Sequence, residues 1–121
     1  MGEEIDLEIA KMTDRIAVVV LKSPSMSDVD AIAAASGKIQ QFVRENQPQT
    51  LIFDFEAVKF FSSLVLGLLL DIRAKMTAYG GEVLISAINP QLHRVFRITN
   101  LDRIFRFFPD RESAVEAASS D

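Results

Sequence analysis

The sequence predicts a single α/β domain with a mixed, mostly parallel β-sheet and about four helices. Short β-rich runs alternate with segments of helical periodicity along the 121 residues. Such alternation is typical of right-handed crossovers between parallel strands. The first two β-rich runs have only a short polar turn between them, which adds an antiparallel N-terminal hairpin.

The hairpin is predicted from residues 5–22. Residues 5–12 alternate apolar and polar side chains, as a half-buried strand does. Residues 15–22 contain the run IAVVVL, typical of a more deeply buried strand, and Thr13 and Asp14 supply the turn. A loop over 23–27 leads to an amphipathic helix over 28–45, for which Ser25 or Ser27 is a candidate N-cap.

The remaining elements alternate between strands and helices. They are a strand over 50–55, a connection over 56–61, an apolar helix over 63–79, a strand over 82–87, a helix begun by Asn89 and Pro90, a strand over 103–108 and a helix over 110–118. Gly80 and Gly81 end the apolar helix, and Asn89 and Pro90 are a typical N-cap and first helical residue. We expect one domain over 1–121, with its core at about 5–118 and one sheet face only partly covered.

Composition excludes several functions. The chain has no cysteine and one histidine, His93, so disulfides, thiolate catalysis and multi-histidine metal sites are ruled out. The net charge of −4 argues against nucleic-acid binding. Arginines between 94 and 111 alternate with phenylalanines, but the spacing sends the rings to the core. The longest apolar run, Leu64–Leu70, is too short to span a bilayer, which takes about 20 residues. We therefore expect a cytoplasmic protein that does not insert into membranes.

The stretch FFSSLVLGLLLD, residues 60–71, holds two adjacent serines at the start of the apolar helix. A serine there can simply cap the helix. It can also be a modification site, since the unpaired N–H groups of a helix start tolerate a phosphate. Both roles are possible together if Ser62 caps the helix and Ser63 faces outward. Leu64 and Val65, if exposed, would form an apolar patch typical of a protein interface.

The chain resembles the STAS domain family, the fold of bacterial anti-sigma-factor antagonists. The strand LIFDF with Asp54, the approach through Val58 and Phe60, and Leu66-Gly67-x-Leu69 match the family pattern. The segment GGEVLISAINPQLHRVFRITNLDRIFRFFPD follows the family form downstream.

The resemblance implies a switch. In such proteins a serine at this turn is phosphorylated by a partner that is both an anti-sigma factor and a serine kinase, and phosphorylation releases the partner. Carried over, Ser63 takes the phosphoacceptor position, Ser62 the position of the family's Asp, and Val65 that of its Gly. An alternative register makes Ser62 the acceptor but loses the match at Leu66 and Gly67.

The resemblance also implies where a partner binds. The expected contacts are the helix start and the neighbouring loop, namely Ser62, Ser63, Leu64, Val65, Ser25, Met26 and Ser27. No catalytic residue, metal or cofactor is expected, because the kinase would hold the ATP. Two alternatives remain open: a STAS-like subunit of a stress-signalling or lipid-transport complex, without phosphorylation, and a small-ligand binder that uses Asp54 and the loop over 23–27. The oligomeric state is not predicted.

Overall fold

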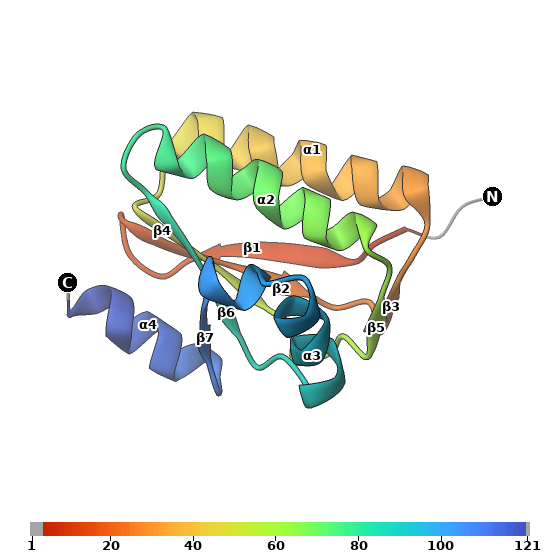
Figure 1. Ribbon diagram of the computed structural model, residues 1–121. Helices are drawn as coiled ribbons and strands as arrows, with labels where there is room; N and C mark the ends of the chain where they lie inside the picture. Colours follow the sequence, from red (N-terminus) through yellow and green to blue (C-terminus); the bar gives the residue numbers. More distant parts are fainter. Residues whose placement is uncertain (1–3, 121) are drawn as a thin grey trace.

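The computed structural model describes residues 4–120, which form a five-stranded mixed sheet with helices on both faces (Figure 1). The strand order is β1-β2-β4-β6-β7. The strands are β1 (Leu7–Lys11), β2 (Ile16–Leu21), β4 (Thr50–Asp54), β6 (Glu82–Ser86) and β7 (Arg106–Phe108). Only the β1–β2 pair is antiparallel, and the other pairs are parallel. The predicted hairpin and mixed sheet are confirmed.

Two helices cover one face of the sheet and a third covers the other. Helices α1 (Val29–Asn46) and α2 (Leu64–Thr77) lie side by side on one face, whereas α4 (Arg111–Ser119) packs on the opposite face (Figure 1). Side chains of successive strand residues point to opposite faces of the sheet. Leu51 and Phe53 face α1 and α2, whereas Ile52 packs with Ala114 of α4. The second face, which was expected to be only partly covered, carries α4 over a smaller apolar cluster.

A series of edge-to-face aromatic contacts holds α3 (Pro90–Ile98) near the carboxyl ends of the strands. The Phe96 ring makes edge-to-face contacts with Phe61 and Phe105, at centroid distances of 6.0 Å each. Phe61 in turn contacts Phe55 at 5.9 Å. The side chain of Asn89, which caps α3, also donates to the carbonyl of Val58 (3.3 Å). These contacts hold α3 against the segment that precedes α2.

The structure differs from the predicted elements in three places. Two short strands, β3 (Ser25–Met26) and β5 (Phe60–Phe61), pair in parallel where loops were expected. The predicted strand over 103–108 starts late, because Asn100 takes a left-handed conformation (φ 62°) and a 3-10 turn, η1 (Leu101–Arg103), follows it. Asp28, and neither Ser25 nor Ser27, caps α1: its carboxylate accepts from the N–H of Ala31 (2.9 Å).

Candidate functional site

Two segments distant in the sequence meet at the carboxyl edge of the sheet. Strands β2 and β4 are parallel neighbours, so the segments that leave them emerge on the same side. There β3 pairs with β5, Ser25 opposite Phe60 and Met26 opposite Phe61. The N–H of Ser62 also donates to the carbonyl of Met26 (2.9 Å). The loop over 23–27 and the start of α2, both expected at the site, are thus joined by backbone hydrogen bonds.

Ser63 occupies the N-cap position of α2 but does not cap it. Its backbone is helical (φ −59°, ψ −16°) and its hydroxyl makes no capping bond. A serine that caps through its side chain needs an extended backbone, as Asn89 has at the start of α3 (ψ 160°). Ser63 is exposed, so its hydroxyl faces solvent.

Ser62 does not cap the helix either, contrary to the sequence-based expectation. Its hydroxyl oxygen is buried and has no hydrogen-bond partner among the residues described. Its carbonyl, in contrast, accepts from the N–H of Val65 (3.0 Å). The backbone of the two serines closes the first turn by itself, because the Ser63 carbonyl likewise accepts from the N–H of Leu66 (3.0 Å). The first turn of α2 carries no acidic side chain, so its positive end is free of a competing carboxylate.

The apolar patch at the helix start differs in membership from the predicted one. Leu64 is 44% exposed, but Val65 is only 1% exposed and packs in the core. Met26 is also buried, so neither Val65 nor Met26 can touch a partner directly, whereas Ser25 and Ser27 are exposed. Sequence periodicity could not separate Leu64 from Val65, because the inward face of α2 is set by how it lies against α1.

Two further apolar residues are exposed on the elements around this helix start. Phe60 on β5 is 54% exposed, and Val29, the first residue of α1, is 64% exposed. Neither was among the predicted site residues. Phe60 could have been singled out, since alternation along a short strand sends one of two neighbouring phenylalanines outward.

The patch continues into a groove between α1 and α2. The groove has a volume of about 470 Å³, and its lining includes Val29, Gly37, Leu64, Gly67 and Asp71. Neither glycine is required by packing, because a Cβ atom built on either one meets nothing within 4 Å. Because they have no side chains, the two glycines leave open space in the walls of the groove.

The sequence matches the STAS domain family over residues 9–114. This chain belongs to the STAS domain family. The fold is close to that of the anti-sigma-factor antagonist SpoIIAA in its unphosphorylated form, with a TM-score of 0.84 at 21% identity over 96% of this chain and 98% of that one. The phosphorylated form of SpoIIAA from Bacillus aligns with a TM-score of 0.74 at 22% identity, covering 93% and 99% of the two chains.

Further solved relatives share this STAS fold. An anti-sigma-factor antagonist from Mycobacterium paratuberculosis aligns with a TM-score of 0.79 at 25% identity, covering 94% of this chain and 93% of that one. The STAS domain of a SulP transporter from Vibrio cholerae aligns with a TM-score of 0.71 at 20% identity, covering 91% and 85%. The fold therefore occurs both in anti-sigma-factor antagonists and within transporters. Within residues 4–120, no helix combines the length and apolar character needed to cross a membrane.

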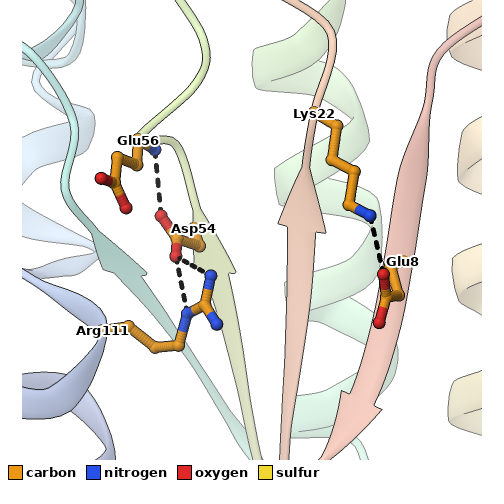
Figure 2. Close-up of polar contacts among 5 residues, drawn as sticks. All are labelled: Glu8, Lys22, Asp54, Glu56 and Arg111. Carbon is orange, nitrogen blue, oxygen red and sulfur yellow. Dashed lines mark hydrogen bonds and ion pairs between the residues drawn. The ribbon is translucent and has the colours of Figure 1, made fainter.

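Asp54, the acidic residue in the STAS strand pattern, is engaged in the fold. It is 1% exposed; one carboxylate oxygen accepts from Nε of Arg111 at 2.8 Å and forms an ion pair with Nη2 of the same residue, also at 2.8 Å (Figure 2). The other oxygen accepts from the N–H of Glu56 (2.9 Å). Asp54 thus ties the end of β4 to α4 and is not free to bind a ligand beside the loop over 23–27. No group of three or more potential metal ligands lies together among residues 4–120.

His93 and the phenylalanines of the arginine-rich segment take part in packing. The His93 ring packs edge-to-face on Phe107 at a centroid distance of 4.6 Å. Phe96 and Phe105 lie in the core, as the spacing predicted, and Arg106 lies over the Phe108 ring at 5.4 Å.

Proposed function

We propose that this chain is a non-enzymatic regulatory domain that acts as an anti-sigma-factor antagonist. In this proposal it binds an anti-sigma factor that is also a serine kinase, and phosphorylation of Ser63 releases that partner. The observation that carries the proposal is the Ser63 hydroxyl: it is exposed, makes no capping bond, and stands at the start of α2 beside exposed Leu64.

The surroundings of Ser63 support a protein partner. Leu64 follows Ser63 and is exposed, Val29 lines the groove between α1 and α2 together with Leu64, and Phe60 on β5 is also exposed. A phosphate on Ser63 would place about two negative charges and their water shell in the middle of this surface. A partner packed on Leu64 would then have to desolvate the phosphate, which is costly. Binding is therefore expected to be lost while the helix start tolerates the charge.

A mapped phosphorylation site tests the proposal directly. The protein is incubated with the candidate kinase and ATP, and the modified residue is identified by mass spectrometry. The expected product carries phosphate on Ser63, and Ser63→Ala is not modified. Phosphate on Ser62 would support the alternative register, whereas modification at neither serine would overturn the switch.

Affinity measurements test the release. Ser63→Asp is expected to bind the partner more weakly than Ser63→Ala by at least about tenfold, or about 1.4 kcal/mol. Ser119→Asp is the matched control, because Ser119 is exposed on α4 at the opposite face of the sheet. An equal loss in both aspartate variants would point to net charge and would contradict a role for Ser63.

The second candidate is a constitutive STAS subunit of another complex, of the stress-signalling or lipid-transport kind. The groove between α1 and α2 favours it, because this surface needs no phosphate to bind a protein. Unchanged binding in Ser63→Ala and Ser63→Asp, with strong loss when Gly67→Leu fills the groove, would favour this candidate.

A further inference from the structure

We propose that the outer edge of β1 binds an extended segment of a partner protein in which apolar and basic residues alternate. The segment would add to the sheet as a further strand. This surface is separate from the Ser63 site, since it lies between β1 and α1, whereas the groove described above lies between α1 and α2. Three features carry the proposal: open backbone groups, two successive hollows and an acidic surrounding.

Among residues 4–120, the backbone of β1 has hydrogen-bond partners on one side only. The Asp6 carbonyl accepts from the N–H of Lys22 (2.8 Å), and the Asp6 N–H donates to Ser23 Oγ (2.8 Å), so the Asp6 backbone faces β2. Because the facing side alternates along an antiparallel strand, the N–H and C=O groups of Leu7 and Ile9 point away from β2. β1 ends the sheet, so these groups form an open edge to which an extended peptide can add.

Two hollows follow one another along this edge. The first, of about 420 Å³, is lined by Ile5, Leu7 and Ala34 among others. The second, also of about 420 Å³, is lined by Leu7, Ile9 and Phe42 among others. Side chains on one face of a strand recur about every 7 Å, and the hollows are offset by one such step, from Ile5–Leu7 to Leu7–Ile9. Two apolar side chains, two positions apart in the added strand, would occupy them.

The surroundings of the edge are mainly acidic. Among the residues that the structure describes, the lining of the hollows includes the acidic residues Glu4, Asp28, Asp30 and Glu45 and the basic residue Lys38. On the opposite face, the side chains of Asp6 and Glu8 follow the same edge, because even-numbered residues of β1 point away from α1. Glu8 is paired with Lys22 at 2.7 Å (Figure 2), whereas Asp6 is exposed. Basic residues alternating with the apolar ones would lie on this opposite face, beside Asp6 and Glu8, whereas the acidic residues that line the hollows lie on the face of the apolar residues.

Charge also argues against a second copy of this chain as the occupant. Symmetric pairing of two β1 edges would bring Glu4, Asp6 and Glu8 of each copy toward the acidic edge of the other. Like charges on neighbouring strands are destabilising, and charged edge strands are a known protection against such self-pairing. A basic partner segment would instead be attracted to the same carboxylates.

A labelled peptide of about seven residues, in which valine and lysine alternate, is the probe for this edge. Its binding to the wild-type protein is measured by fluorescence anisotropy. The control is a peptide of the same composition in which the valines are consecutive. Two further peptides carry backbone N-methyl groups, one on the valines and one on the lysines. Only one of these sets of N–H groups can face β1, so one methylated peptide is expected to lose at least about tenfold in affinity and the other to keep it.

Two neighbouring alanines of α1 supply matched protein variants. Ala34 lines the first hollow beside β1, and Ala33 lines the groove toward α2. Both are exposed, so leucine at either position is expected to leave the fold intact. Ala34→Leu should lower the affinity for the alternating peptide by at least about tenfold. Ala33→Leu and Ser63→Asp should leave this affinity unchanged.

Several outcomes overturn the proposal. Equal binding of the alternating and blocked peptides would show a non-specific charge effect, and equal effects of the two methylations would exclude strand addition. A loss in Ala33→Leu as large as that in Ala34→Leu would place the peptide elsewhere. If the wild-type protein sediments as a dimer that Ala34→Leu dissociates, and the peptide does not bind, a second copy is the occupant.

Discussion

Among single residues, Asp54 shows most clearly how a side chain of the family pattern is used by the fold. Its carboxylate is almost fully buried and receives Arg111 from α4. We expect Arg111→Met to lower the free energy of unfolding by about 3 kcal/mol, because it leaves a buried carboxylate without its cation. Urea denaturation at neutral pH measures the loss.

Arg106→Met is the control for this variant. Arg106 also forms an ion pair, with Glu82 at 3.7 Å, but both side chains are substantially exposed. Its loss is expected to cost no more than about 0.5 kcal/mol. Equal effects of the two variants would mean that burial of Asp54 does not govern the energy of its ion pair.

Ser62 is expected to be dispensable for stability. Its hydroxyl is buried without a hydrogen-bond partner among the described residues, and removing such a group recovers its desolvation cost. Ser62→Ala should therefore change the free energy of unfolding by less than about 0.5 kcal/mol or increase it. Asn89→Ala is the comparison, since Asn89 accepts from the N–H of Leu92 (2.9 Å) and its loss should cost about 1 kcal/mol. A loss of that size in Ser62→Ala would restore the capping role.

Among the helices, α2 carries a glycine that its own packing does not need. A Cβ at Gly67 meets nothing within 4 Å, so Gly67→Ala should raise the free energy of unfolding by about 0.5–1 kcal/mol. Gly81→Ala should lower it, because a Cβ there lies 2.9 Å from Met76 Cε and 3.2 Å from the Gln49 carbonyl. Thermal denaturation compares the two. A gain in stability with weaker partner binding in Gly67→Ala would connect the glycine to the groove.

Helix α4 is expected to respond to acid through its N-cap. The N–H of Ser113 donates to the Asp110 carboxylate (2.7 Å), and this bond holds the pKa of Asp110 below its usual value. Because the folded pKa is the lower one, the stabilisation is complete above about pH 4 and is lost as the pH falls through the folded pKa. The free energies of unfolding of the wild type and Asp110→Asn are compared in urea from pH 6 downward. The wild type should lose stability relative to Asp110→Asn as the pH falls. A difference independent of pH would contradict this role of the carboxylate.

Over the whole molecule, local patterns predicted most of the architecture. Alternation in 5–12 and the run IAVVVL placed the hairpin, and Asn89 with Pro90 placed the start of α3, where the structure has them. These features are local, because a cap or a strand face is set by residues within a few positions. The parallel order of the remaining strands followed from right-handed crossovers.

Features that depend on distant residues could not be predicted in the same way. The partner of Asp54 is Arg111, 57 residues later, and no local spacing connects them. β3 and β5 are two residues each, too short for a periodic signal, and exist because the fold brings them together. The burial of Val65 likewise depends on the contact of α2 with the sheet and α1, so the patch could be located from sequence but its members could not.

If Ser63 is phosphorylated as proposed, we expect the phosphate to change association and to leave folding intact. The hydroxyl is exposed, makes no capping bond and belongs to a helix start without acidic side chains, so the phosphate displaces no native contact and meets the positive end of α2. The melting temperatures of the phosphorylated and unmodified protein should agree within about 2 °C, equivalent to less than about 0.5 kcal/mol for a domain of this size. Partner affinity, measured by calorimetry on the same two samples, should fall by at least about tenfold. A large drop in melting temperature would mean that the modification acts by unfolding the helix start, and the release would then follow from lost structure and not from the phosphate at the interface.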